Sequence, residues 1–492
     1  FVKYSYLVKS ADDIPRIFKE AFYIASTGRK GPVLIDIPCD VQMDLLKKSF
    51  DYTSEVNIRG YKPSTKGNNP QMHKVVAAIN KAKKPLICAG GGVILGNGEE
   101  CVRQFCEKNN IPLVTTMMGI GVMPKNHPLY FGMLGNNGKP YANRAVANSD
   151  LLIIAGARIA DRAVPKPENL EQQVNIIHID IDTAEIGKNL GPTIPLVGDI
   201  KNIFDRLLQE NISIDTTQWI ETLHDIKKST VDHRVFSDKL VNPMLLVQHL
   251  SEKMDDDAIY VADVGQNQLW SADNYVMKNG RFLTSGGMGT MGYSIPAGIG
   301  AKMCTPDKQV VVVCGDGSFQ MTSEELAAAF LDHAPVKIAI LNNSVYGMVR
   351  QWQTLFYEHH YSQTNLLDGE AHGADGAAAL ADGDAPLEVP DFIKLAEAYG
   401  CVGIRAFTEE EAIAAIEKAN QINDRPVLID FRVWKDAMVW PMVAAGAPND
   451  EVTYKPGIKP LAGGTPAPGT GPDEHATGVF EHETAAATAS EH

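Results

Sequence analysis

Short runs of apolar residues recur along the chain, and each is followed by a glycine-containing or polar turn and then by a longer helical stretch. The runs are rich in β-branched side chains and lie at 33–37, 85–89, 151–155, 176–181, 309–314, 336–341 and 427–431. Continuous apolar runs, in contrast to alternating ones, indicate parallel strands that are buried on both faces. The pattern therefore predicts an α/β protein whose parallel sheets are covered by helices.

Breaks in this pattern divide the 492 residues into parts, and the length alone predicts about three domains. Residues 1–45 hold one predicted helix (11–26) and one predicted strand, which is too little to enclose a core, so we interpret them as the end of a domain that begins earlier in a longer protein; the chain also starts with Phe1 instead of Met. The other predicted parts are a polar linker at 46–70, an α/β domain at 71–210, a charged helical linker at 211–240, an α/β domain at 241–455 with a surface insertion at 368–388, and a disordered tail at 456–492.

Charge and composition exclude several classes of protein. Lys and Arg number 45 against 60 Asp and Glu, and the net charge of -15 repels phosphate backbones and anionic membranes, so we expect neither nucleic acid nor a membrane as a partner. No apolar run approaches the length of about 20 residues that spans a bilayer, and no secretory signal is seen. The seven cysteines form no C-x-x-C pair, which disfavours a zinc site or a disulfide framework and predicts a cytoplasmic location, with an organelle matrix as the alternative.

The candidate chemistry is concentrated at the ends of two predicted strands. Gly315-Asp316-Gly317-Ser318 follows the run 309–314, and Asn342-Asn343 follows the run 336–341, with a helix predicted between them at 322–332. In a right-handed βαβ unit both strands end at the same edge of the sheet, so Asp316 and Asn343 are predicted to be neighbours. Carboxylate and amide oxygens suit Mg²⁺, and the glycines allow a diphosphate to approach the backbone. Either dipeptide alone is typical of an ordinary turn, but the pair favours a magnesium-diphosphate site.

These residues resemble the thiamine diphosphate signature of the decarboxylase and carboligase superfamily. Three further stretches narrow the resemblance to the large subunits of acetohydroxyacid synthase (acetolactate synthase): Val264-Gly-Gln-Asn-Gln-Leu-Trp270, Ser285-Gly-Gly-Met-Gly-Thr-Met-Gly-Tyr293 and Gly347-Met-Val-Arg-Gln-Trp-Gln353. The resemblance covers about residues 1–455. It implies a thiamine diphosphate-binding fold at 241–455, a Rossmann-like FAD-binding domain at 71–210, and a remnant of a pyrimidine-binding domain at 1–45.

The resemblance also implies roles for individual residues. Asp316, Asn343 and the carbonyl of Val345 would bind Mg²⁺. Met291 would bend the thiamine cofactor, Trp352 would favour 2-oxobutyrate over pyruvate as the second substrate, and Met348 is a third catalytic candidate. The residues implied to bind thiamine diphosphate are Gln266, Asn267, Gly289, Met291, Gly315, Asp316, Gly317, Ser318, Asn343, Gly347 and Met348.

Glycine turns also end the predicted strands of the domain at 71–210, with Gly90-Gly91-Gly92 after 85–89 and Gly156-Ala157-Arg158 after 151–155. Such turns at successive strand ends predict a nucleotide site. The resemblance implies FAD in a largely structural role, and an empty pocket is the alternative. The implied FAD contacts are Arg29, Gly91, Thr115, Met133, Leu134, Gly156, Arg158, Arg162, Asp180 and Asp199.

The reaction that the resemblance implies decarboxylates pyruvate and joins the hydroxyethyl unit to pyruvate or 2-oxobutyrate. The products are 2-acetolactate or 2-aceto-2-hydroxybutyrate, in the biosynthesis of valine, leucine and isoleucine. A homodimer or tetramer and a regulatory small subunit are implied as well. The activating glutamate of the family belongs to the pyrimidine-binding domain and has no counterpart in this sequence, so we hypothesise that this chain alone binds the cofactor weakly and is inactive. Two alternative interpretations remain. One is another thiamine diphosphate carboligase, oxidase or decarboxylase, and the other is a non-catalytic cofactor-binding module.

Overall fold

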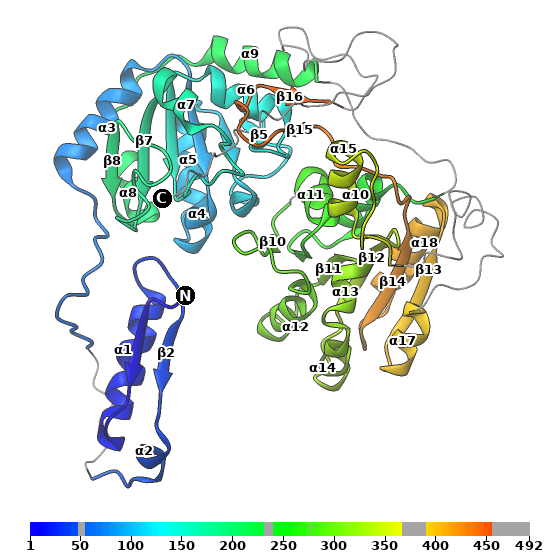
Figure 1. Cartoon of the computed structure of the whole chain (residues 1–492). Coiled ribbons are helices and arrows are strands. Elements are labelled where there is room, and N and C mark those ends of the chain that lie inside the picture. Colours follow the sequence, from blue (N-terminus) through cyan, green and yellow to red (C-terminus); the bar gives the residue numbers. More distant parts are fainter. Residues whose placement is uncertain (48–54, 231–239, 277, 367–389, 455–492) are drawn as a thin grey trace, which may run out of the picture.

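The computed structural model describes residues 1–47, 55–230, 240–276, 278–366 and 390–454 (Figure 1). These residues form a small N-terminal block and two α/β domains, each of which contains a parallel sheet of six strands. The α/β fold with parallel sheets that the apolar runs predict is therefore confirmed. The predicted insertion at 368–388 and the predicted tail at 456–492 lie outside the described residues.

The N-terminal block contains one strand more than the sequence predicts. Its elements are β1 (Tyr4–Leu7), η1 (Ala11–Asp13), α1 (Ile14–Ser26), β2 (Val33–Asp36) and α2 (Cys39–Met43). Strand β1 pairs in parallel with β2, but it has only four residues and none of them is buried, so it leaves no apolar run in the sequence. Helix α1 buries Ile17, Ala21 and Ile24, which recur at helical spacing on the face toward the small sheet.

The central domain is a doubly wound sheet with the strand order β5-β4-β3-β6-β7-β8. Its strands are β3 (Pro85–Ala89), β4 (Leu113–Thr115), β5 (Tyr130–Met133), β6 (Leu151–Ala155), β7 (Asn175–Asp180) and β8 (Ile194–Val197). Its helices are α3 (Asn69–Lys81), α4 (Gly91–Leu95), α5 (Glu99–Asn109), η2 (Met117–Gly119), α6 (Pro140–Asn148), α7 (Pro167–Gln173), α8 (Ile200–Leu207) and α9 (Thr217–Lys228). Helix α9, which falls in the predicted linker 211–240, packs into the core of this domain, and its Trp219 Nε1 donates to the carbonyl of Pro85 over 3.1 Å.

The third domain repeats this plan with the strand order β10-β9-β11-β12-β14-β13. Its strands are β9 (Ile259–Ala262), β10 (Arg281–Thr284), β11 (Val310–Gly315), β12 (Lys337–Asn342), β13 (Val402–Ala406) and β14 (Val427–Arg432). Its helices are α10 (Pro243–Lys253), α11 (Gln266–Asn274), α12 (Ser294–Cys304), α13 (Asp316–Gln320), η3 (Ser323–Glu325), α14 (Leu326–Leu331), α15 (Gly347–Phe356), α17 (Phe392–Ala398) and α18 (Glu409–Gln421). The single helix predicted at 322–332 is thus divided into η3 and α14, and a separate short helix, α13, begins at Asp316.

Successive residues of the central strands of this domain enter different cores. Val311 and Val313 of β11 pack on one side of the sheet, while Val310 and Val312 pack on the other. A strand that is buried on both faces needs apolar side chains at every position, which explains the continuous runs in the sequence. The described part of the chain contains no helix with the length and apolar character needed to cross a membrane.

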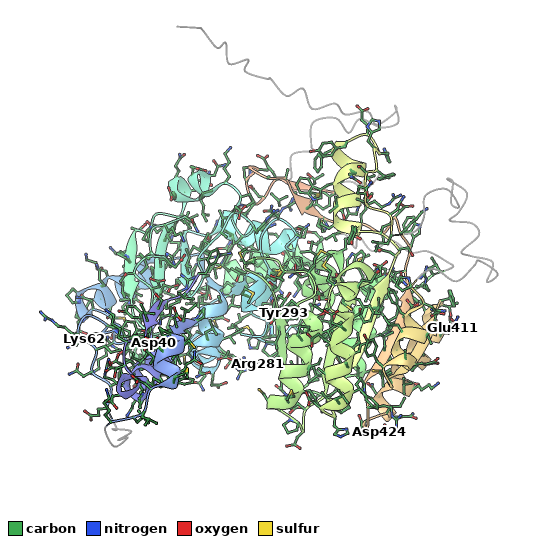
Figure 2. All side chains as sticks on the ribbon, turned by 60° about the horizontal axis from the view of Figure 1, so that its bottom comes forward. Asp40, Lys62, Arg281, Tyr293, Glu411 and Asp424 are labelled. Carbon is green, nitrogen blue, oxygen red and sulfur yellow. The ribbon has the colours of Figure 1, made fainter. Side chains whose placement is uncertain are left out.

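Polar contacts join the central and third domains. Arg281, which Figure 2 labels near the boundary of the two domains, forms an ion pair with Glu99, and Lys139 forms one with Asp273 over 2.6 Å. After β14 the chain returns to the central domain and forms an antiparallel hairpin of β15 (Met442–Val443) and β16 (Val452–Thr453). The N–H of Val443 donates to the carbonyl of Asn136 over 2.6 Å, so the end of the described chain fastens one domain to the other.

Candidate active site

The carboxyl edge of the third sheet brings together the two strand ends that the sequence singles out. Strand β11 pairs with β12 so that Gly315 lies opposite Leu341, and Asp316 and Asn343 follow these strands at the same edge. The carboxylate of Asp316 accepts the backbone N–H of Ser344, which is the residue next to Asn343. Both side chains are buried. The predicted juxtaposition of Asp316 and Asn343 is confirmed.

The electrostatic state of Asp316 indicates what it could bind. Burial raises the pKa of Asp316 to about 7, although backbone N–H groups and the nearby Arg432 favour the charged form. A divalent cation beside this carboxylate would supply the missing positive charge. The described residues contain no group of three His, Cys, Asp or Glu side chains that could hold a metal, so a cation here would also need amide and carbonyl oxygens such as those of Asn343 and Val345.

Gln266, at the start of α11, lies between several of the predicted residues. Its Oε1 accepts from Asn343 Nδ2 over 3.4 Å, and a Cβ atom at Gly347 would lie 2.0 Å from the same oxygen. A larger residue at 347 would therefore displace the side-chain amide of Gln266. The neighbouring Asn267 donates to the carbonyl of Asp263 over 2.8 Å.

The remaining diphosphate candidates pack tightly around the start of α13. The Ser318 hydroxyl and the backbone of Gly315 exchange hydrogen bonds of 3.1 Å, and a Cβ atom at Gly317 would lie 2.5 Å from the ring of Tyr346. Glycine is thus required at 317 by the close approach of an aromatic ring. The residues of these strand ends do not line the large cavity described next.

A cavity of about 2250 Å³ lies beside this cluster, between the N-terminal block and the two α/β domains. Gly289, Met291, Met348 and Trp352 of the third domain line it. The predicted residues that line it from the other parts are Arg29, Gly91, Met133, Leu134, Gly156, Arg158, Arg162, Asp180 and Asp199. The cavity therefore gathers most of the predicted flavin contacts and some of the predicted thiamine-site residues. The other thiamine-site candidates do not line it: Gln266, Asn267, Gly315, Asp316, Gly317, Ser318, Asn343, Val345 and Gly347.

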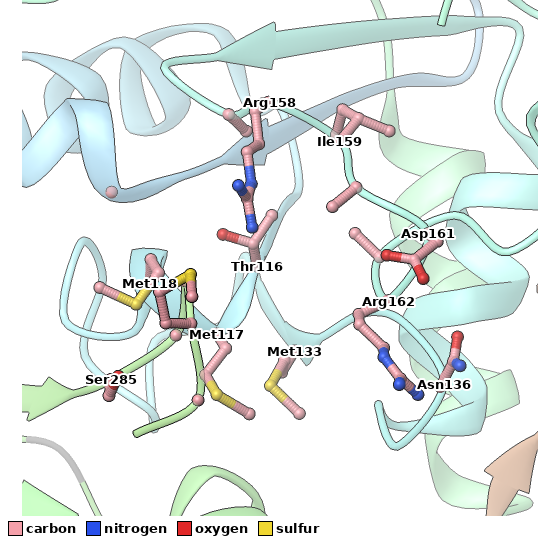
Figure 3. A pocket seen from close by; sticks show the side chains of 18 of the residues that line it. Thr116, Met117, Met118, Met133, Asn136, Arg158, Ile159, Asp161, Arg162 and Ser285 are labelled. Atoms are coloured by element: carbon pink, nitrogen blue, oxygen red, sulfur yellow. The ribbon is translucent and has the colours of Figure 1, made fainter. Parts of the chain in front are cut away.

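Figure 3 shows the wall that the central domain contributes. Arg158 points toward Thr116, and Met117, Met118 and Met133 lie on one side of the pocket. The Met118 side chain of this wall contacts Gly286 of the third domain, because a Cβ atom at Gly286 would lie 2.2 Å from Met118 Sδ. The wall joins polar groups with adaptable apolar ones, as is typical of a site for a large planar ligand.

The glycine turns of the central domain meet where the strand order reverses, between β3 and β6. Gly92 N–H donates to the carbonyl of Gly156 over 2.9 Å, and a Cβ atom at Gly90 would lie 2.4 Å from that carbonyl oxygen. Burial raises the pKa of Asp180, which closes β7 at the same edge. These features agree with a nucleotide site at the switch point.

Two predicted flavin contacts have other partners in the structure. Thr115 is fully buried, its hydroxyl bonds the Tyr130 hydroxyl over 3.0 Å, and it is Thr116 that lines the cavity. Thr115 is the last residue of the buried strand β4, whereas Thr116 follows the strand and begins the turn into η2. Arg29 lines the cavity but pairs with Asp182 and Glu185 over 3.0 and 2.5 Å, and it thereby ties the N-terminal block to the central domain.

Sequence reasoning missed two buried polar residues of the site. Asp263 follows β9 and accepts hydrogen bonds from Val264, Gly292 and Ser294, which fixes the loop that carries Met291. Gln351 is the one residue of α15 that is buried. A signal existed for Asp263, because it stands at a strand end like Asp316. No feature of the sequence distinguishes Gln351 from the neighbouring Gln353.

Comparison with known proteins identifies the class to which this fold and site belong. Residues 72–207 match the family described as the thiamine pyrophosphate enzyme central domain, and residues 263–431 match the thiamine pyrophosphate enzyme C-terminal TPP binding domain. The two α/β domains are therefore those of a thiamine pyrophosphate enzyme.

Full-length relatives narrow the class. The chain is 43% identical to "Acetolactate synthase" of Mycobacterium leprae over 467 residues, which cover 93% of this chain and 72% of the relative. It is 42% identical to "Acetolactate synthase large subunit" of Corynebacterium glutamicum (94% and 72% covered) and 39% identical to "Probable acetolactate synthase large subunit" of Methanocaldococcus jannaschii (90% and 73% covered). The chain belongs to the acetolactate synthase large-subunit family.

Proposed function

We propose that this chain supplies the magnesium and thiamine diphosphate site of an enzyme that decarboxylates pyruvate and joins the two-carbon unit to pyruvate or 2-oxobutyrate. The products would be 2-acetolactate or 2-aceto-2-hydroxybutyrate, which supply branched-chain amino acid biosynthesis. The observation that carries the proposal is the cluster of Asp316, Asn343 and Gln266 at one sheet edge, beside a cavity lined by Met291 and Trp352.

The chain's own residues divide the work. Asp316, Asn343 and the Val345 carbonyl would hold Mg²⁺, and the raised pKa of Asp316 supports the need for a cation there. Thiamine diphosphate, when bound, would supply the electron sink for decarboxylation and condensation. Gly315 would let a diphosphate approach the backbone, whereas Gly317 is covered by the ring of Tyr346.

The cavity wall would select the substrates. Trp352 is 38% exposed, lines the cavity and packs against Phe356 with 5.0 Å between ring centroids. An aromatic wall that recognises one additional methylene contributes about 1–3 kcal/mol, which suits a preference between 2-oxobutyrate and pyruvate. Met291 and Met348, with flexible apolar side chains, would shape the space around the cofactor.

The central domain would hold FAD. The tight glycine turns at 90–92 and 156, together with Arg158 and Arg162 on the cavity wall, suit a dinucleotide whose phosphates carry negative charge. A homodimer or tetramer, a regulatory small subunit and a cytoplasmic location complete the proposal, and they rest on the family alone.

Calorimetric titration with thiamine diphosphate, with and without Mg²⁺, tests the site. The wild-type chain should bind only when Mg²⁺ is present, and Asp316→Asn should weaken that binding by about tenfold or more, because a ligand and its charge are lost. Asp332→Asn, at an exposed carboxylate of the same domain, is the control and should bind as the wild type does. Binding that does not depend on Mg²⁺, or that Asp316→Asn leaves unchanged, would contradict the proposed metal site.

A second candidate function is a decarboxylase or oxidase of the same class. A product assay with pyruvate plus 2-oxobutyrate separates these enzymes, because a decarboxylase releases an aldehyde while the proposed reaction gives acetohydroxy acids. The assay also tests the hypothesis that this chain alone is inactive, which acetolactate formed by the purified chain would refute. The cavity position of Trp352 favours the acetohydroxy acids.

A further inference from the structure

Helix α15 is held in an unusual way. It is ten residues long and carries exposed apolar side chains, Val349 at 53% and Trp352 at 38%, yet its one buried residue is the polar Gln351. A helix whose buried anchor is an amide depends on the direction of hydrogen bonds for its placement, because apolar contacts alone tolerate rotation and sliding. The partners of Gln351 therefore decide where Trp352 lies.

Both the nitrogen and the oxygen of the Gln351 amide form hydrogen bonds. Its Nε2 donates to the carbonyl of Val439 over 3.0 Å, and its Oε1 accepts the Val439 N–H over 2.9 Å. The Gln351 amide thus pairs with the backbone of the segment after β14 in the way that a neighbouring strand pairs, donating one hydrogen bond and accepting one. The same Oε1 also accepts from Gln266 Nε2 over 3.0 Å.

Gln266 extends the connection into the strand-end cluster. Its second Nε2 bond goes to the carbonyl of Ala437 over 2.9 Å, and its Oε1 accepts from Asn343 over 3.4 Å. Gly347, one turn before Gln351 on α15, packs against that same Oε1. Helix α15 thus contacts Gln266 at Gly347 and at Gln351. Gln266 in turn bonds directly to Asn343, a proposed Mg²⁺ ligand.

The C-terminal segment carries the connection to the central domain. Beyond Val439 the chain enters β15, where Val443 bonds Asn136, and Ala444 and Ala445 line the cavity. One amide therefore stands where α15, the segment 437–445 and the strand-end cluster meet.

We propose that Gln351 is a positioning residue for the thiamine diphosphate site, which acts through Gln266 on the cofactor end and through Val439 on the C-terminal segment. This inference rests on the proposed function, because it assumes that the cluster around Gln266 binds the cofactor. It makes the geometry of the cluster and the placement of the segment 437–445 depend on each other.

A double-mutant cycle on cofactor affinity tests the coupling. Gln351→Met keeps the volume and removes the amide, and it should weaken binding of magnesium-thiamine diphosphate by about tenfold, as loss of a group that orients a ligand-binding residue typically does. In a Gln266→Met background the same change should have little further effect. Gln248→Met is the matched control, since Gln248 lies in the same domain and donates to Glu252 of its own helix α10 over 2.7 Å, and it should bind as the wild type does.

Equal effects of Gln351→Met and Gln248→Met, or effects of Gln351→Met and Gln266→Met that simply add, would overturn the proposal and leave Gln351 as a packing residue. Failure of the wild type to bind thiamine diphosphate would instead count against the proposed function. Hydrogen exchange on the wild type keeps the inference testable should Gln351→Met not fold. The Val439 amide should be protected together with the amides of α15, and exchange at the rate of an open segment would refute the clamp.

Discussion

The carboxylate of Asp263 provides the sharpest test of how the loop before α12 is held. Asp263 is fully buried at the end of β9. Its Oδ1 accepts the N–H groups of Val264 and Gly292 over 2.7 and 3.0 Å, and its Oδ2 accepts the N–H and the hydroxyl of Ser294 over 2.8 and 2.6 Å. Met291 stands directly before Gly292, so this carboxylate fixes the backbone that presents Met291 to the cavity.

Asp263→Asn replaces one of the two oxygens by an amide group that can only donate. The Ser294 hydroxyl can rotate and accept from the new amide, but the Ser294 N–H then faces another donor and stays unsatisfied. A buried donor without a partner costs about 1–3 kcal/mol, and the donor pair repels in addition, so we expect a loss of about 2–4 kcal/mol in local stability. Ser294→Ala removes only one of the four bonds and should cost about 1 kcal/mol.

Native-state hydrogen exchange of the Gly292 and Ser294 amides is the suitable assay, since a chain of several domains does not unfold in two states. Asp263→Asn should raise exchange at both amides, while amides of the central sheet, such as that of Ile153 in β6, keep their protection. A loss below about 0.5 kcal/mol at Gly292 would refute the argument that this carboxylate holds the loop.

Two further predictions concern the sheets themselves. Lys337, the buried first residue of β12, has a pKa lowered by burial to about 8, so the unfolded chain binds its proton more tightly between pH 8 and 10.5. In chemical denaturation, Lys337→Met should therefore raise the free energy of unfolding by about 1–3 kcal/mol at pH 7 and by less at pH 10.5. An equal gain at both pH values would contradict the electrostatic cause. Gly156 has a φ of +56°, and a Cβ atom there would lie 2.8 Å from the backbone of Gly92, so Gly156→Ala should destabilise the central domain by about 2–4 kcal/mol. A thermal transition like that of the wild type would show that the turn can yield.

The parts of the fold that the sequence predicts well are those where burial alone dictates the residue type. Strands β11 and β12 are buried on both faces, so each leaves a continuous apolar run, and the βαβ handedness rule then places Asp316 beside Asn343. The same reasoning fails for β1, because its four residues are all exposed or half-buried and carry no run to detect.

Other features depend on contacts that lie far apart in the sequence. Gln351 and Gln353 stand two positions apart in one helix, and which of them is buried is decided by Val439, 88 residues after Gln351. Thr115 ends β4 and is buried, while Thr116 stands just beyond the strand and lines the cavity, so an error of one residue in the strand end exchanges core and cavity. No local pattern contains either piece of information.

The two halves of the candidate site are held by separate sets of hydrogen bonds, and this separation has a consequence for binding. Asp263 fixes the loop that carries Met291, while Gln351 and Gln266 fix the start of α15 and approach Asn343. Neither set needs a bound ligand to form, since both are complete within the chain. The residues around Asp316 are therefore already in position when a cation binds. The entropy cost of ordering them, which weakens flexible sites, is met during folding. A change in either set should weaken metal-dependent binding without removing any group that touches the metal, which a site built only from its direct ligands would not show.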